Sequence, residues 1–154
     1  MKKIILLGLI FISINSTAHY YGSDGLTIGI TSGANIGYHN NAGIGAWFDF
    51  GQYGIEIGRG TATNRPTSLQ PTMHYENIVA YENIKLKTMQ MQIGVGGFVC
   101  TAFSFISGRI ENTISPMVMV GITKDLSYGS RYVFKTNLMA GTIPTLNIGI
   151  GMKL

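Results

Sequence analysis

The chain has 154 residues, enough for one domain, and its 21 glycines, 8 tyrosines and 7 phenylalanines disfavour helices and favour strands. Its 11 basic side chains outnumber 7 acidic ones, but no run of five basic residues exists, which argues against nucleic-acid binding. The single cysteine, Cys100, excludes a disulfide within the chain, so a large core or a closed hydrogen-bonded structure must hold the fold.

The N-terminal segment has the three parts of a secretory signal peptide. Two lysines begin it, residues 4–14 form an apolar run too short to span a membrane as a helix, and Ser16 and Ala18 are the small residues of a cleavage site. A core helix is the alternative, but the run is apolar all round and ends in small polar residues. We expect cleavage after Ala18, with Ser16 as second choice, which leaves residues 19–154 as the mature domain.

Beyond this segment, apolar and polar or glycine residues alternate at period two, the pattern of amphipathic strands. Around the second strand, for example, Ile44, Ala46 and Phe48 share one face, whereas Gly43 and Gly45 share the other. No run is long enough for a membrane helix. The alternation predicts eight strands, at residues 25–38, 42–50, 53–60, 74–83, 89–106, 117–124, 128–137 and 146–154.

The connections between these strands are of two kinds. Strands two and three, four and five, and six and seven are joined by short turns, whereas longer polar loops are expected at residues 61–73, 107–115 and 138–144. Strands of this length can cross a bilayer when tilted, and barrels with both termini in the periplasm have short inner turns and longer outer loops. The sequence therefore predicts an all-β fold, an eight-stranded antiparallel up-and-down transmembrane β-barrel.

The apolar face of such a barrel can point inward or outward. A soluble, lipocalin-like barrel would fill its interior with the apolar residues. The opposite face, however, is rich in glycine, as at Gly54, Gly94 and Gly151, and small residues suit the narrow interior of an eight-stranded barrel. That face also carries Glu76 and most other charged strand residues, which can neutralise one another in a lumen. We therefore predict a lumen charge cluster of Asp49, Glu56, Glu82, Arg131, Lys135 and Lys153.

Aromatic residues stand near the predicted strand ends. Interfacial girdles are one explanation, and ordinary strand propensity is the other. The candidates are Phe48, Phe50, Tyr53 and Tyr128 beside the short turns, and Tyr38 and Tyr75 beside the outer loops.

The last predicted strand, residues 146–154, has a purely apolar face ending at Leu154. Its Asn147, Gly149, Met152 and Leu154 resemble the C-terminal signal by which bacterial outer-membrane barrels are recognised for assembly, although the usual last residue is aromatic. The mature chain as a whole resembles the broad class of small eight-stranded outer-membrane β-barrel proteins of Gram-negative bacteria. That resemblance implies an outer-membrane location and, as partners, the barrel assembly machinery, outer-membrane lipids and lipopolysaccharide.

Candidate reactive residues are few. The three histidines show no metal-ligand spacing, so no metal or cofactor is expected. Ser68, His74 and Glu76 are a weak candidate for a catalytic triad at the outer rim, because the class includes lipid A-modifying acyltransferases and deacylases. The deacylases' His-x-Ser-Asn motif is absent, since no serine follows His39. Cys100 lies between small residues in a strand and is expected to be a small buried side chain.

Three hypotheses for function follow. The first is a non-enzymatic surface or membrane-structural barrel whose loops 61–73 and 107–115 contact lipopolysaccharide or an extracellular ligand, with Arg59 and Arg65 as candidates for binding phosphates. The second is a lipid A-modifying enzyme that uses His74. The third is a soluble periplasmic ligand-binding barrel.

Overall fold

The computed structural model describes residues 25–37, 39–63, 73–104 and 108–154. These residues contain no helix of the length and apolar character needed to cross a membrane. They form eight strands: β1 (Leu26–Asn35), β2 (His39–Phe50), β3 (Tyr53–Thr63), β4 (Met73–Lys85), β5 (Gln90–Ser104), β6 (Arg109–Asp125), β7 (Tyr132–Ala140) and β8 (Thr145–Lys153).

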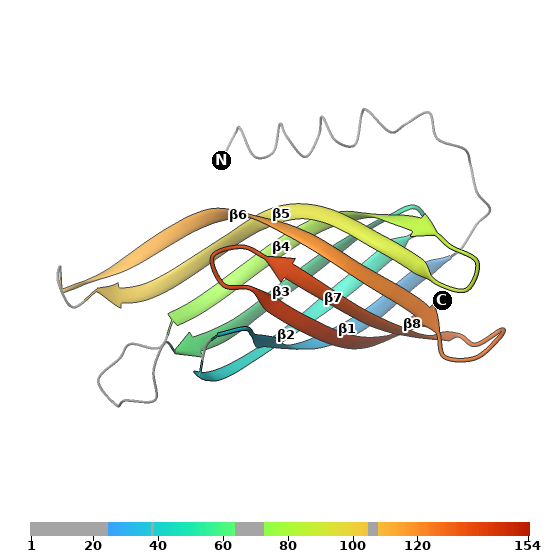
Figure 1. The fold of residues 1–154 in the computed structure, drawn as a ribbon, viewed down its shortest axis with the longest axis horizontal. Helices are drawn as coiled ribbons and strands as arrows, with labels where there is room; N and C mark the ends of the chain where they lie inside the picture. Colours follow the sequence, from blue (N-terminus) through green and yellow to red (C-terminus); the bar gives the residue numbers. More distant parts are fainter. Residues whose placement is uncertain (1–24, 38, 64–72, 105–107) are drawn as a thin grey trace.

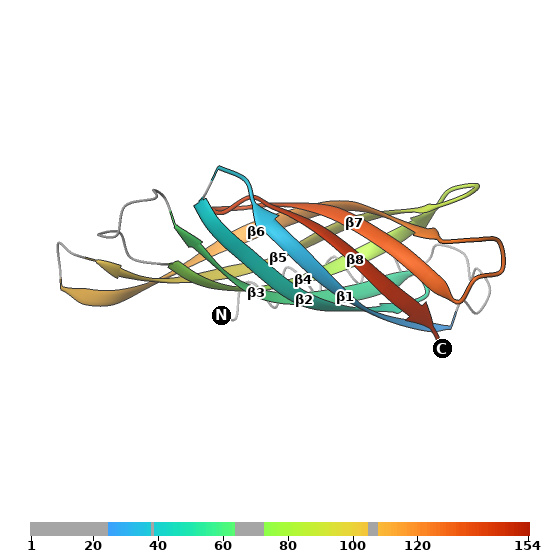
Figure 2. The same ribbon diagram turned by 90° about the horizontal axis from the view of Figure 1, so that it is seen from below.

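The strands close into one antiparallel barrel in which each strand pairs with its neighbours in the chain and β8 pairs with β1 (Figures 1 and 2). This confirms the predicted fold class. The register defines how narrow the barrel is. Cross-strand partners followed from Thr27 around all strands return to β1 at Asn35, and 35 − 27 gives a shear of eight. Eight strands with this shear tilt by about 36° and enclose an interior that side chains fill.

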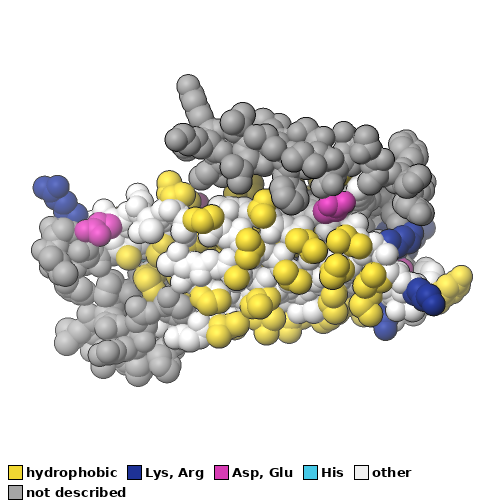
Figure 3. All heavy atoms as spheres, turned by 45° about the horizontal axis from the view of Figure 1, so that its top comes forward, with side chains coloured by type: hydrophobic (Ala, Val, Ile, Leu, Met, Phe, Trp, Pro, Cys, Tyr) yellow, Lys and Arg dark blue, Asp and Glu magenta, His cyan; other side chains and the backbone are white. Residues whose placement is uncertain are grey.

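The outer face of the wall is apolar, whereas the inner face carries both polar side chains and a buried apolar cluster. Large apolar side chains point outward, as at Ile30 (67% exposed), Ile44 (61%) and Val120 (55%). On the face visible in Figure 3 hydrophobic side chains cover the middle, whereas Lys and Arg side chains lie towards the two ends. Polar side chains such as Thr31 and Asn137 are buried inside. The apolar face is therefore outside, as a membrane barrel requires, and the soluble-barrel hypothesis is wrong.

Glycines make room for the large side chains of the interior. The Trp47 ring is fully buried and lies against Gly29 and Gly151, where a Cβ atom would overlap it. In the same way the Tyr81 ring occupies the space that a side chain at Gly54 would need. Aromatic rings packed over glycines fill the narrow lumen without widening the barrel.

The orientation predicted for β4 is wrong. Tyr75, Val79 and Tyr81 point into the barrel, so Glu76 and Glu82 point outward. Tyr75 is only 3% exposed and therefore does not belong to an outer aromatic girdle. The reason is steric, because these side chains fit over glycines of β3 and β5, and this complementarity outweighs the polarity alternation.

The outer side of the barrel also differs from expectation. Most of the loop predicted at 107–115 is strand, because residues 109–115 of β6 pair with β5 beyond the point where β7 ends. The predicted loop 138–144 shortens to residues 141–144, whereas β6 and β7 are separated by residues 126–131, so connection length does not separate the two ends cleanly. Of the predicted loop 61–73, residues 61–63 belong to β3 and Met73 to β4, while 64–72 lie outside the described residues.

Candidate functional site

The centre of the lumen holds a buried ion pair. Lys135 Nζ on β7 lies 2.8 Å from Glu56 Oε2 on β3, and the two side chains are 0% and 1% exposed. The ammonium group also lies 4.1 Å from the centre of the Tyr81 ring and 4.9 Å from that of Trp47. A charge removed from water needs such compensation, and here both a carboxylate and two aromatic faces provide it.

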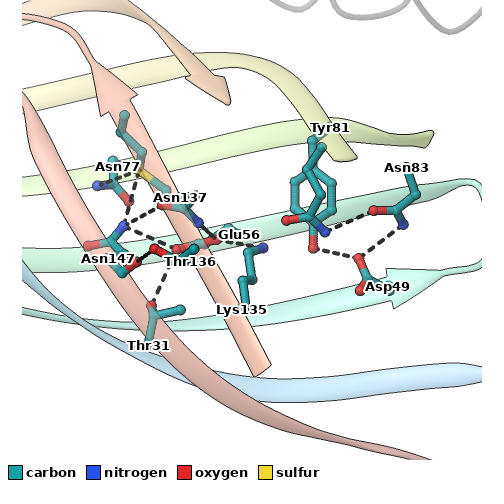
Figure 4. A network of polar contacts seen from close by, with 12 residues as sticks. Thr31, Asp49, Glu56, Asn77, Tyr81, Asn83, Lys135, Thr136, Asn137 and Asn147 are labelled. Carbon is teal, nitrogen blue, oxygen red and sulfur yellow. Dashed lines mark hydrogen bonds and ion pairs between the residues drawn. The ribbon is translucent and has the colours of Figure 1, made fainter. Parts of the chain in front are cut away.

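Neutral donors complete the environment of Glu56 (Figure 4). Asn137 Nδ2 donates to Oε2 at 2.7 Å, and Asn147 Nδ2 and Thr31 Oγ1 each donate to Oε1 at 3.3 Å. The donors come from β7, β8 and β1, so one carboxylate ties together strands from both ends of the chain. This arrangement suits a structural role, because both oxygens of the Glu56 carboxylate already accept hydrogen bonds from the protein itself.

A second network lies nearer the end of the barrel that holds the β2–β3 turn. Tyr81 Oη donates to Asp49 Oδ1 at 2.6 Å, and Asn83 Nδ2 donates to the same oxygen at 3.3 Å. Gln92 Nε2 in turn donates to Asn83 Oδ1 at 2.8 Å. A cluster of buried apolar side chains that includes Phe98, Met119 and Met139 shares the lumen with the two networks. Together they fill the interior, which leaves a plugged barrel rather than an open channel.

The remaining members of the predicted lumen cluster lie elsewhere. Lys153 pairs with Asp125 at 2.8 Å near the end of β8, where both side chains are more than a third exposed. Arg131 is exposed in the β6–β7 connection. Glu82 lies on the outer face of β4 and accepts a hydrogen bond from Gln52 Nε2 at 3.0 Å. The structure therefore brings Glu56, Lys135 and Asp49 together inside and separates the other three from them.

The catalytic candidates are on the outside of the wall. His74 and Glu76 are exposed on the outward face of β4, while Ser68 lies outside the described residues, so the triad stays a prediction. The side chain of His39 and all of Arg65 are likewise outside the described part. Within that part no group of three or more His, Cys, Asp or Glu side chains is arranged to hold a metal ion. Cys100 is a free, buried thiol.

The residues of the predicted assembly signal divide between the two faces. Asn147 and Gly149 point inward, and Asn147 is part of the Glu56 network. Met152 (42% exposed) and Leu154 (65% exposed) point outward. Sequence reasoning did not assign Thr31 and Asn147 to a lumen network, although each shares a strand face with glycines.

Comparison with known proteins gives a fold but no family. No protein-family model and no curated protein matches the chain. Solved structures do, and each of those named here is similar along nearly all of its own length. They are neisserial surface protein A (TM-score 0.61, 10% identity, 87% of this chain and 100% of that one), the N-terminal barrel domain of OprF from Pseudomonas aeruginosa (0.58, 8%, 87% and 100%) and the attachment invasion locus protein Ail of Yersinia pestis (0.51, 15%, 84% and 96%).

A de novo designed transmembrane β-barrel is also similar, with a TM-score of 0.55 and 14% identity over 88% of this chain and 100% of the design. At these identities the likeness establishes the fold alone. The chain thus has the fold of eight-stranded outer-membrane β-barrels, which confirms the resemblance drawn from its sequence.

Proposed function

We propose that this protein is a non-enzymatic barrel of the outer membrane of a Gram-negative bacterium that presents its β5–β6 hairpin to an extracellular protein. In this proposal residues 1–18 are removed on export, and the barrel assembly machinery recognises the strand that ends at Leu154. The ends of the barrel are assigned by the termini, since residue 25 and residue 154 lie at the same end, opposite the hairpin.

The observation that carries the proposal is the length of the hairpin. β6 pairs with β5 from Arg109 onward, whereas β7 first pairs with β6 at Val118. The two strands project past the rest of the barrel (Figures 1 and 2). β6 meets the β7–β8 connection at Ser115, whose hydroxyl lies 2.7 Å from that of Thr142. Residues 109–114 therefore lie beyond the β6–β7 ladder, which begins at Val118.

The edge of a strand beyond such a ladder can bind an extended segment of another protein by strand addition. The β6 edge has features of a recognition surface, because Ile110 (69% exposed) and Ile114 (61%) stand out from it between polar residues. Main-chain hydrogen bonds would provide affinity, and contacts to the two isoleucines would provide selectivity.

The proposal can be tested by binding to whole cells. Bacteria that display the protein are incubated with a fixed panel of labelled extracellular-matrix and serum proteins, and binding is measured by flow cytometry. The double variant Ile110→Lys with Ile114→Lys should lose at least ten-fold in binding of any panel member that the unmodified protein binds. Thr142→Lys, on the neighbouring connection, is the control and should bind normally. Equal binding by the double variant, or no binding by the unmodified protein, would refute this function.

A further inference from the structure

A groove crosses the outward wall of the barrel from β8 to β4, with a volume of about 990 Å³. β8, β1 and β2 lie side by side across this face in Figure 2. Two rows of cross-strand partners border the groove. One runs from Ile150 to Ile57, and the other runs from Ile148 through Ser32 and Ile44 to Arg59. The lining is predominantly apolar, and the small side chains of Ser32 and Ala46 open the bordering rows.

The length of the groove follows from the strand register. Partners in a row lie about 4.8 Å apart, so the four steps from β8 to β4 span about 19 Å. The hydrocarbon core of a bilayer is about 30 Å thick, so the chains of one leaflet extend over about 15 Å. The groove is therefore long enough for one acyl chain, and its lining is suited to it.

The groove ends at two charged residues that face outward. Arg59 and Glu76 are direct cross-strand partners on β3 and β4 and both are exposed. Arg59 is the next outward residue after Ile57 on β3, and Glu76 is the outward residue before Ile78 on β4, so both lie beyond these isoleucines on the side away from the short β2–β3 turn. No side-chain hydrogen bond or ion pair within the described residues engages Arg59 or Glu76. The pair thus stands at the border of the apolar band with its charged groups available to a ligand.

A second, more polar depression of about 520 Å³ continues from this end of the groove. It shares Ile44, Arg59 and Glu76 with the first and adds His74 and the hydroxyl-bearing Thr61 and Thr101. An apolar groove thereby leads directly into a polar recess at the outer border of the band. A groove and recess of this kind suit an amphiphile with a large hydroxylated headgroup.

We propose that the groove and the recess together bind a phosphorylated glycolipid of the outer leaflet. The Arg59 guanidinium donates to the lipid phosphate, and Glu76 and Thr61 bond to sugar hydroxyls. The Thr101 hydroxyl donates to Asn112 Oδ1 at 2.8 Å, so towards the ligand it acts as an acceptor. One acyl chain lies in the groove between Ile148 and Ile57. The proposal depends on the membrane placement proposed above but not on the role of the hairpin. A zwitterionic phospholipid could engage Arg59 and Glu76, but its small headgroup would leave the hydroxyl-bearing part of the recess empty.

Native mass spectrometry of the purified protein in detergent, titrated with hexa-acylated lipid A, tests the site. Arg59→Gln removes the phosphate donor, and Ala46→Phe fills the groove. Each should weaken lipid A binding about ten-fold. The matched controls are Arg131→Gln, an exposed arginine at the other end of the barrel, and Ala80→Phe, an outward alanine of β4 that does not line the groove. Both controls should stay within two-fold of the unmodified protein.

Three outcomes would overturn the site: equal losses in test and control variants, no binding of lipid A by a folded barrel, or equal binding of phosphatidylethanolamine in competition. Heat-modifiable migration on a detergent gel shows that each variant is a folded barrel. Failure of this site would leave the cell-binding result for the hairpin unaffected, so the two proposals fail separately.

Discussion

At the scale of single residues, the most costly feature of the barrel is the buried Lys135–Glu56 pair. Removing one member leaves a buried charge without its partner, which costs about 3–5 kcal/mol, whereas removing both together is far less harmful. We predict that Lys135→Met lowers the free energy of unfolding by about that amount and that the double variant with Glu56→Gln recovers much of it. Equilibrium unfolding in urea, with the protein in lipid vesicles, measures both.

The exposed ion pair is the matched control for this experiment. Lys153 and Asp125 are 38% and 42% exposed, so Lys153→Met should cost less than about 1 kcal/mol. A Lys135→Met barrel as stable as the Lys153→Met barrel would show that the central pair contributes little.

The glycines of the lumen give a second prediction at this scale. Gly29→Ala places a methyl group where the Trp47 ring lies, and overpacking of this kind costs about 1–3 kcal/mol. Gly97→Ala meets no atom within 4 Å and should be tolerated. The same unfolding experiment compares the two, and a neutral Gly29→Ala would mean that the ring moves aside without loss.

At the scale of elements, period-two alternation was enough to predict the number of strands and their order. It failed to orient β4, because one face of that strand carries conflicting signals. Tyr75 and Tyr81 are typical of lipid-facing positions, whereas Asn77 and Asn83 are typical of lumen positions. In the structure all four side chains point inward. Which face points inward is decided by glycines on neighbouring strands, and that requires the register. The projecting part of β6 was missed for a different reason, since a strand beyond the membrane needs no apolar face.

The β3–β4 connection gives the prediction at this scale. β3 and β4 are paired up to Ala62 and Met73, so the strands do not depend on residues 64–72 for their register. We predict that replacing residues 65–71 by two glycines leaves a barrel that inserts into detergent and lipid, with stability changed by less than about 0.5 kcal/mol. Refolding yield and the urea midpoint provide the measurement. A variant that no longer folds would indicate that the connection packs into the barrel.

At the scale of the whole molecule, closure determines what this chain can do. The shear of eight makes the lumen narrow, and buried side chains such as Trp47, Tyr81 and Lys135 occupy it. The surfaces available for binding a partner are therefore the outer wall and the projecting hairpin. The outer wall was predictable as an apolar face. The groove ending at Arg59 and Glu76 was not, because its borders are rows of residues from different strands that only the register brings together.

Closure also makes assembly depend on the terminal strand, since β8 must pair with β1 to complete the barrel. The Leu154 side chain is 65% exposed and points outward, whereas its backbone nitrogen donates to Leu26 at 2.8 Å, a bond that a new side chain does not remove. Leu154→Asp places a charge on the lipid face near the interface, where the insertion cost is at most about 1 kcal/mol, and also deletes the last hydrophobic residue of the predicted assembly signal.

We therefore predict that Leu154→Asp lowers the amount of barrel in outer membranes by about ten-fold or more, in keeping with loss of recognition, but lowers refolding into lipid vesicles only slightly, in keeping with the modest insertion cost. Lys153→Asp is the control and a demanding one, because it breaks the ion pair with Asp125 yet leaves the apolar face intact. Outer-membrane fractions and vesicle refolding yields are compared for both variants. Because recognition acts only in cells, a Leu154→Asp deficit of equal size in vesicles would assign the effect to insertion energy. Equal yields of the two variants in both settings would show that the terminal residue has no special role.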